Sequence, residues 1–355
     1  ANTTLSADVG SANIAADDWW DANWENRQRI TFDNTASSEN LTDFPVLVTL
    51  DSTNFDFAKI KADGADIRFI DDDGTALSYE IESWDDVGET AKVWVKVQQI
   101  DANVDTDFIW VYYNNAAATD AQNAANVWDA NYQGVWHLHD DLLDSTSNNL
   151  DATNNGSTDA GGLIADGQAF DGTNDYIQSS LPSFLTDIGN KDFTVQFIFN
   201  ADDVTAGGTP WIRLFEIMDD NNEFAQLVIQ NSASGALNFV VEDNGTQRVV
   251  SVDTNITAGT WYHAVGVWDA SADEVKFYLN GIEQTGPGAT GANAGSIQGV
   301  TLGRRSDGGG NSYYDGLGDE FRISNTIRSA DWIEAEYLSQ NGVFAFNTFG
   351  GEEAQ

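Results

Sequence analysis

Four short apolar runs follow one another in the middle of the chain: FTVQFIFN (193–200), WIRLFEIM (211–218), FAQLVIQ (224–230) and ALNFVVED (236–243). Each run has the length of a β-strand and is rich in β-branched and aromatic residues. Further runs of this kind recur at intervals of about 8–15 residues, with turn residues between them, and this spacing is typical of an antiparallel sandwich or jelly roll.

Short apolar runs separated by turn residues also occur on both sides of this stretch, from Trp19 to Ser324. In AKVWVKV (91–97) apolar and polar residues alternate, so that Val93, Val95 and Val97 share one face of the predicted strand. Only SADWIEAEYLSQ (329–340) looks helical, with a serine as its N-cap. The chain is therefore predicted to be all-β, with two antiparallel β-sandwich (jelly-roll) domains in tandem.

Composition shifts along the chain suggest where these domains begin and end. The first residues are small and polar, and a stretch rich in Ala and Asn separates the two strand-rich regions. We predict the following segments: a polar lead-in at 1–18, an N-terminal domain at 19–113, a linker at 114–130, a second domain at 131–349 and a tail at 350–355.

The charge balance narrows the possible partners. Asp and Glu number 57 against 15 Lys and Arg, which gives a formal net charge of -42, and the chain has no Cys. So negative a surface repels phosphate backbones and anionic lipids, which argues against binding to nucleic acids and membrane surfaces. No stretch approaches 18 uninterrupted apolar residues, so we expect no membrane insertion. The lack of Cys excludes disulfides, thiolate metal sites and cysteine nucleophiles. Residues 1–18 show no signal-peptide pattern, as in a processed secreted or an excised chain. The acidic, Cys-free and Lys-poor composition favours an extracellular or cell-surface setting.

The motifs of the second region resemble a known superfamily. FDGTNDYIQ (170–178), WYHAVGVWD (261–269), VKFYLNGIEQ (275–284) and GDEFRISNTIRSADWIEAEY (318–337) stand in register over about 134–345. Together they resemble the concanavalin A-like lectin/glucanase superfamily, in its laminin-G-like bacterial branch. The resemblance implies a jelly roll that recognises carbohydrate.

The first region also resembles a bacterial domain, one of unknown function that is often found just upstream of such a lectin-like domain. The residues that carry this resemblance include WWDANWENRQRITFDN (19–34), GADIRFIDDDG (64–74) and FIWVYYNN (108–115). This resemblance implies an order of domains and identifies no functional residue.

The resemblance further implies a structural Ca²⁺ at Asp319, on the last long strand of the jelly roll. Calcium needs six to eight oxygen ligands. We expect the others to come from the segment after the domain's first strand: Asp140, Asp141, Asp144 and Asn149. Alternatively, Asp319 caps a strand end and the others are solvated turn residues.

The turn DDDG (71–74) partly matches an EF-hand calcium loop, with Asp71, Asp73 and Glu80 at ligand positions. The first ligand position would fall on Phe69, which has no oxygen in its side chain. We therefore favour a β-turn with solvated carboxylates.

The loop RRSDGGGNSYYDG (304–316) is the best candidate for contact with a ligand. Sugar recognition combines an aromatic platform with polar groups for the hydroxyls. The residues expected to contact a glycan are Arg304, Arg305, Asn311, Tyr313 and Tyr314. The arginine pair would favour a carboxylated or sulfated sugar. Alternatively, the arginines pair with nearby Asp residues and the tyrosines pack on the sandwich edge.

The sequence supports a catalytic function less than it supports a binding function. The spacing of Glu80, Glu82 and Asp85 resembles that of the carboxylates on the catalytic strand of the glucanases, but these residues lie in the first region, outside the lectin-like domain. His137 and His139 share a strand face that could hold zinc. We assign no catalytic residue.

We therefore predict an extracellular, non-catalytic binding module that is stabilised by calcium and whose partner is a polysaccharide or glycan, with the arginine pair favouring an anionic one. Two alternatives stay open. The chain could be a structural subunit or spacer of a surface filament or adhesin, which would self-associate or contact neighbouring domains without any small ligand. It could also be a hydrolase acting on glycans.

Overall fold

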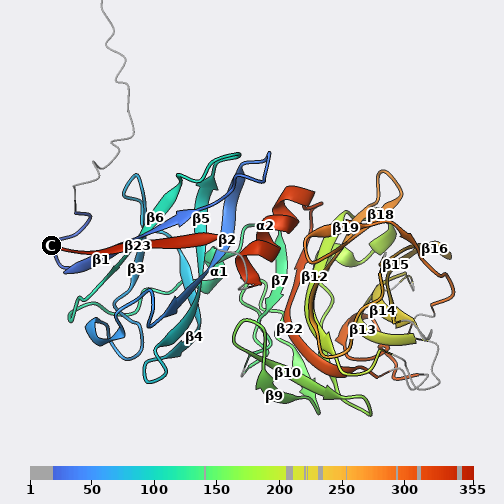
Figure 1. Cartoon of the computed structure of the whole chain (residues 1–355). Helices are drawn as coiled ribbons and strands as arrows, with labels where there is room; N and C mark the ends of the chain where they lie inside the picture. The colour runs from blue at the N-terminus through green and yellow to red at the C-terminus, as the bar shows by residue number, and fades with distance from the viewer. Residues whose placement is uncertain are drawn as a thin grey trace, which may run out of the picture. The chain divides into compact units, whose positions relative to one another are not determined.

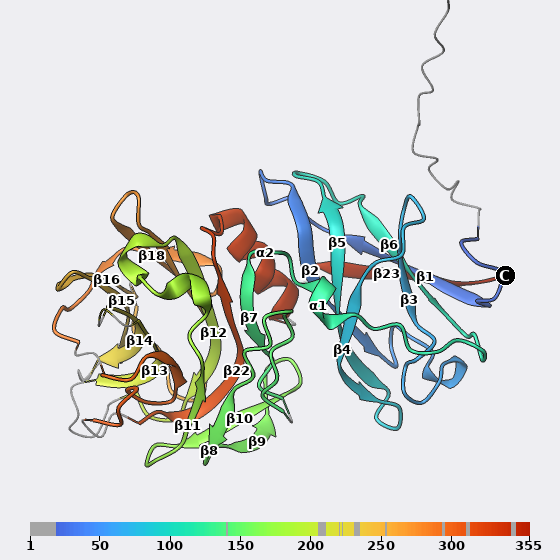
Figure 2. The same cartoon turned by 180° about the vertical axis from the view of Figure 1, so that it is seen from behind.

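The structure is a computed structural model that describes residues 19–139, 141–204, 211–219, 221, 223–230, 235–252, 254–292, 295–309, 313–341 and 346–355. The chain divides into two compact units (Figures 1 and 2). The first unit runs to Asn123 and takes in Phe346–Gln355 again, and the second spans Ala124–Ala345. The second unit is therefore inserted into the first, between its last two strands. The predicted all-β class with antiparallel sheets is confirmed.

The first unit contains two antiparallel sheets. One has the order β23 (Asn347–Ala354), β1 (Asn26–Phe32), β6 (Phe108–Tyr113) and β3 (Arg68–Asp71). The other has the order β2 (Leu41–Asp51), β5 (Thr90–Ile100) and β4 (Tyr79–Asp85), and a 3-10 turn, η1, covers Phe57–Lys59. The expected alternation in β5 holds, because Val93, Val95 and Val97 are all buried. Trp94, on the opposite face, is buried as well and donates a hydrogen bond to Glu82 (Nε1–Oε2 2.6 Å).

The C-terminal residues complete the first unit. Strand β23 pairs antiparallel with β1 (Figure 1), and Phe346 packs against Phe32 and Phe44, with ring centroids 6.3 and 5.9 Å apart. The prediction that the second domain runs to 349 and is followed by a tail at 350–355 is therefore wrong. The short, Gly-interrupted stretch carries little strand signal of its own and becomes a strand because β1 offers it an edge.

The expected linker at 114–130 is also wrong as a separate segment. Its first half lies against the first unit: the Asn115 amide donates to Asp66 (3.1 Å) and the Asn123 amide donates to the Tyr79 carbonyl (2.9 Å). Its second half belongs to the second unit, where the short helix α1 (Ala124–Val127) precedes the buried Trp128. Because hydrogen bonds pair the polar groups of its backbone, this segment is part of the two units and not a separate linker.

The second unit is a sandwich of two larger sheets. In sequence of hydrogen-bonded neighbours, one sheet consists of β19 (Ile282–Gln284), β18 (Glu274–Leu279), β17 (Trp261–Asp269), β12 (Phe193–Ala201), β22 (Asp315–Ser324), β10 (Asp166–Asp171) and β9 (Thr158–Gly161), with β7 (Tyr132–Trp136) also paired to β22. The other consists of β20 (Gly286–Pro287), β16 (Thr246–Ser251), β15 (Ala236–Asp243), β14 (Phe224–Gln230), β13 (Trp211–Met218), β21 (Gly299–Leu302), β11 (Tyr176–Ser179) and β8 (Thr153–Asn155). Two 3-10 turns, η2 (Ser183–Leu185) and η3 (Ile188–Asn190), lead into β12.

The core of the second unit lies between these two sheets. Phe321 of β22 meets Phe197 of β12 and Phe215 of β13, with ring centroids 5.8 and 5.3 Å apart. Helix α2 (Ala330–Gln340) begins where the predicted Ser329 N-cap accepts from the Trp332 amide (3.1 Å), and its Ile333 packs on the outer face of the first of these sheets. Neither this helix nor any other that the structure describes is long and apolar enough to cross a membrane.

Replacing Phe346 by Ala tests the role of the C-terminal strand. We expect the free energy of unfolding of the first unit to fall by about 3–5 kcal/mol, because a buried ring leaves a cavity between Phe32 and Phe44. Chemical denaturation, followed by tryptophan fluorescence, measures the change. Thr348→Ala, at an exposed position of β23, is the control and should change little. Equal effects of the two substitutions would contradict the assignment of this strand to the core.

Candidate functional site

The two adjacent arginines of the predicted ligand loop have different surroundings. The Arg304 guanidinium carbon lies 3.3 Å from the ring centroid of Tyr176, so the side chain stacks on that ring. Arg305 instead forms an ion pair with Asp307, through Nε–Oδ1 at 2.7 Å and NH2–Oδ2 at 3.2 Å. The open alternative, pairing with an Asp, therefore holds for Arg305.

The two tyrosines of the loop also differ from each other. Tyr314 is fully buried, packs against Phe170 with centroids 5.6 Å apart, and donates a hydrogen bond to the Leu317 carbonyl (2.8 Å). Its expected role as a platform for a sugar ring is therefore wrong, because the sandwich edge covers the ring. Tyr313 is half-buried, and Asn311 lies outside the described residues.

A polar groove of about 350 Å³ runs along β8 and β11, beside the arginine–tyrosine stack (Figure 2 labels both strands). Its lining consists of Asp151, Thr153, Asn155, Gln178, Ser179, Ser180 and Gln298. Hollows that bind small ligands begin at about this volume. The groove is therefore a candidate site of the second unit.

The register of β8 and β11 explains how the groove is built. Tyr176 lies opposite Asn155, and Gln178 lies opposite Thr153. Directly opposed residues of an antiparallel pair project to the same face, and so do residues two apart on one strand. Ile177, between them, is buried in the core. The four polar or aromatic side chains therefore share the outer face, where they offer amide and hydroxyl groups beside an aromatic ring.

Tyr176 and Gln178 fall within the motif FDGTNDYIQ (170–178), but that motif does not single them out as site residues. The alternation of Tyr176 and Gln178 around a buried Ile177 was the available signal. The partner strand β8 has only three residues, Thr153–Asn155, and no apolar member. No periodicity marks so short a strand, which is why the groove could not be found from the sequence.

The described residues of the predicted calcium set serve separate local functions. The Asp144 carboxylate accepts from the Val135, Thr146 and Leu150 amides at 2.9–3.0 Å and holds its own turn together. Asp141 and Asn149 are exposed, and Asp140 lies outside the described residues. The carboxylates of Asp141, Asp144 and Asp319 do not lie within 4.8 Å of one another, so these residues as placed do not fit one calcium ion.

Asp319 itself is fully buried at the bulge of β22. Its Oδ2 accepts from the Leu163 and Ile164 amides at 2.8 and 3.0 Å, and its Oδ1 has no hydrogen-bond partner. Burial, together with the neighbouring Glu320, raises the pKa of Asp319 to about 7. The side chain therefore anchors the loop before β10, in agreement with the alternative of a structural role.

Three other carboxylates in the second unit do converge. Oxygens of Asp187, Asp219 and Glu223 lie within 4.8 Å of one another. Backbone amides already occupy two of these carboxylates: Asp219 accepts from Ile188 (2.9 Å) and Glu223 accepts from Gly189 (3.0 Å). The cluster thus fastens the η3 turn to the β13–β14 connection.

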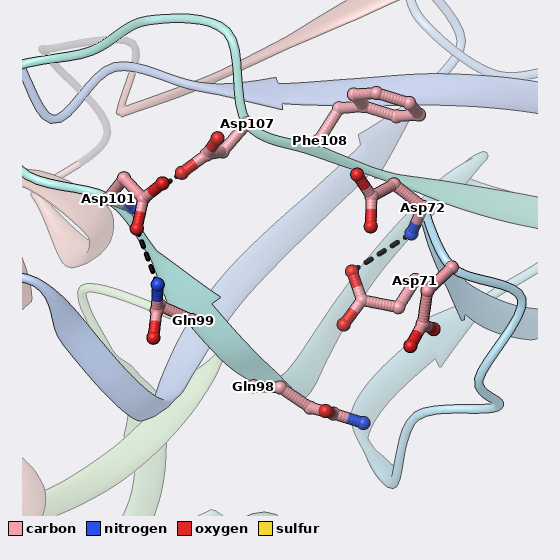
Figure 3. A pocket seen from close by; sticks show the side chains of 8 residues that line it. Asp71, Asp72, Gln98, Gln99, Asp101, Asp107 and Phe108 are labelled. Atoms are coloured by element: carbon pink, nitrogen blue, oxygen red, sulfur yellow. Dashed lines mark hydrogen bonds between the residues drawn. The ribbon is translucent and has the colours of Figure 1, made fainter. Parts of the chain in front are cut away.

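An acidic pocket of about 330 Å³ lies in the first unit (Figure 3). Figure 3 shows Asp71 and Asp72 facing Asp101 and Asp107 across it, and the other lining residues are Asp73, Gln98, Gln99 and Phe108. Asp71 belongs to the turn that the sequence marked as a partial EF-hand. Burial, then repulsion from Asp72 and Asp73, raises the pKa of Asp71 to about 6.

The residues weighed for catalysis or zinc have structural partners. Glu82 accepts the hydrogen bond from Trp94 described above, and His137 Nδ1 lies 2.6 Å from Glu320 Oε1. Although burial alone would raise it, His137 and Arg322 hold the pKa of Glu320 below its usual range. Arg322 pairs with the same carboxylate and stacks over Trp128 at 4.6 Å. Within the second unit, His137, Glu320 and Arg322 thus form a buried polar network on the outer face of β22.

Comparison with protein families confirms the expected architecture. Residues 171–334 match the family described as "Concanavalin A-like lectin/glucanases superfamily". Residues 63–159 match the family described as "Domain of unknown function (DUF2341)". The second unit therefore carries a concanavalin A-like domain, preceded by a DUF2341 region. The comparison with curated proteins gives no match.

Several solved structures resemble this chain at low sequence identity. Domain 4 of a GH43 extracellular arabinanase from Geobacillus stearothermophilus, in complex with arabinotriose, is 20% identical (TM-score 0.45; 57% of this chain, 96% of that one). The binding domain of Paraclostridial Mosquitocidal Protein 1 is 15% identical, with a TM-score of 0.45, and the match covers 59% of this chain and 52% of that one. The receptor-binding domain of botulinum neurotoxin C/D mosaic serotype is 13% identical, with a TM-score of 0.47, and the match covers 59% of this chain and 51% of that one. The chain thus spans about half the length of the two toxin domains.

Asp71 predicts a pH dependence of stability. Its pKa of about 6 in the folded chain exceeds the value of about 3.9 for an unfolded Asp, so stability is lost as the pH rises from about 4 through 6. Asp71→Asn should make the free energy of unfolding less dependent on pH across this window. Denaturation of both proteins at several pH values measures the difference, with Asp105→Asn, at an exposed position, as control. Parallel curves for parent and Asp71→Asn would contradict the prediction.

Asp319→Ala separates the structural role from the calcium hypothesis, which stays a prediction. Without calcium, the variant should lose about 1–3 kcal/mol of unfolding free energy, because the buried Ile164 amide and the half-buried Leu163 amide lose their acceptor. Thermal unfolding in calcium chloride and in sodium chloride of equal ionic strength gives the calcium-specific rise in Tm. If Asp319 is a ligand, this rise disappears in the variant. A rise of equal size in both proteins would remove Asp319 from calcium binding.

Proposed function

We propose that this chain, whose residues 171–334 belong to the concanavalin A-like lectin/glucanase superfamily, is a carbohydrate-binding module. The glycan lies in the polar groove of β8 and β11. The observation that carries the proposal is the ladder of outward side chains there: Tyr176 and Asn155 form one rung, and Gln178 and Thr153 form the next.

The chemistry of the groove suits a sugar. Amides and hydroxyls both donate and accept hydrogen bonds, as sugar hydroxyls require. Tyr176 is half-buried at the end of the ladder, where its ring adds apolar surface to the hydrogen-bonding groups. From Tyr176 to Ser180 the strand direction extends over about 13 Å, which accommodates a short oligosaccharide.

The proposal is for a binding module without catalysis. Glycoside hydrolysis commonly needs two carboxyl groups on either side of the scissile bond. Among the lining residues of the groove, Asp151 is the single carboxylate. Glu80 and Glu82 belong to β4 of the first unit, a separate fold. These placements favour binding over hydrolysis.

An extracellular setting is part of the proposal. A formal net charge of -42 makes the folded chain repel itself, and a medium rich in salt or calcium screens that repulsion. Weak single-site affinity suits repeated display on a surface, because several linked sites bind a polysaccharide more tightly than one.

A structural subunit is the second candidate, and one observation favours it. In the described first unit β23 is an edge strand, and an open edge can pair with another chain. The strand carries Glu352 and Glu353, however, and charged residues of this kind discourage edge pairing. Concentration-dependent assembly without any glycan, seen by sedimentation, would favour this candidate.

The groove is tested by replacing Gln178 and Asn155 together with Ala. We expect the parent to bind an oligosaccharide with a Kd on the order of 10⁻³ to 10⁻⁵ M. The double variant should bind at least roughly tenfold more weakly, because two sets of hydrogen bonds are lost. A glycan array identifies the ligand, and titration calorimetry measures the affinities. Gln98→Ala, in the acidic pocket of the first unit, is the matched control.

Two results would count against the proposal. If the parent binds no glycan on the array, the chain is not a carbohydrate-binding module of the kind proposed. If Gln98→Ala weakens binding and the double variant does not, the glycan binds in the first unit.

A further inference from the structure

Two neighbouring arginines of the second unit have different electrostatic surroundings. Arg305 shares its charge with Asp307 through two contacts, at 2.7 and 3.2 Å. Arg304 stacks on Tyr176 at 3.3 Å, and no described carboxylate forms an ion pair with it. Its Nε atom is buried and has no hydrogen-bond partner.

Among the described arginines, Arg27, Arg248, Arg305, Arg322 and Arg328 each form an ion pair with a carboxylate, and Arg304 does not. An unpaired guanidinium that is partly withdrawn from water retains its full charge and its demand for acceptors. Stacking on the Tyr176 ring restricts the side chain to one plane. Such a planar, pre-positioned fork is suited to a carboxylate or a sulfate.

The arginine is also placed at one end of the polar groove. Tyr176, on which it stacks, lies opposite Asn155 of the groove lining and two residues before Gln178. Asp151, the carboxylate of the lining, precedes Thr153 and so belongs toward the opposite end. The groove therefore has a positive end at Arg304 and a negative end at Asp151.

We propose that Arg304 binds the acidic group of a carboxylated or sulfated sugar, and that the groove thereby selects acidic over neutral glycans. This inference rests on the proposed function. The glycan then lies in one direction, with its acidic group at Tyr176 and its hydroxyls donating to Asp151. The global charge of -42 opposes acidic ligands at long range, but at about 0.15 M salt this repulsion is screened beyond about 8 Å, while the direct contact persists.

The test uses pairs of probes that differ only in charge. One pair is an oligogalacturonate and its methyl-esterified form, and the other is a sulfated galactan oligosaccharide and its desulfated form. Calorimetry at about 0.15 M salt gives the ratio of affinities within each pair. For at least one pair the parent should bind the acidic member roughly 10- to 100-fold more tightly, as for hydrogen bonds between charged groups.

The adjacent arginines supply a matched control. Arg304→Gln should bring the ratio close to one while binding of the neutral member persists, and Arg305→Gln should leave the ratio as in the parent. Arg304→Lys, which keeps the charge and loses the planar fork, should retain a reduced preference. If a Tm measurement shows that Arg304→Gln is unfolded, Arg304→Lys takes its place in the test.

The outcomes separate the two proposals. Equal affinity of the parent for both members of each pair overturns the role of Arg304 and leaves the carbohydrate-binding function standing. The role of Arg304 is also overturned if Arg304→Gln keeps the parent's ratio of affinities. The same holds if Arg305→Gln lowers this ratio as much as Arg304→Gln does. Failure of the parent to bind any probe or any glycan on the array contradicts the proposed function itself.

Discussion

Burial of every second residue in strand β11, which lies between β21 and the edge strand β8, is the constraint on which the candidate site depends. Ile177 enters the core between the two sheets and is 1% exposed, as is Phe321 on the facing sheet. Because side chains alternate along a strand, this burial forces Tyr176 and Gln178 to the outer face. A shift of one residue in register would bury the polar residues and expose the isoleucine. The hydrophobic core therefore determines which side chains a ligand meets.

The same packing positions the arginine. Leu302 pairs with Ile177 and is buried beside it, and the chain then turns at Gly303. This glycine has a φ of +87°, and a Cβ there would lie 2.7 Å from the Phe170 ring. Only glycine combines this conformation with so close an approach. The tight turn directs Arg304 onto Tyr176, so a backbone constraint in the core determines the charge at the end of the groove.

The sequence predicted the parts of the structure that follow from periodicity. Val93, Val95 and Val97 are buried as expected, and Ser329 caps the helix that follows it. Residues whose position depends on distant partners could not be predicted. Tyr314 looks like an exposed loop residue until Phe170 covers it, and the stretch 347–354 is a strand because β1 pairs with it. The groove needed the three-residue strand β8, which has no pattern of its own.

The central claim is that the outer face of β8 and β11 is the glycan-binding surface. Titration of the ¹⁵N-labelled chain with an oligosaccharide selected on an array, followed by amide NMR shifts, tests it most directly. We expect the largest shifts at Thr153, Asn155, Tyr176 and Gln178, with Arg304 affected in addition when the sugar is acidic. Shifts confined to other residues, such as those of the acidic pocket around Asp71, would contradict it.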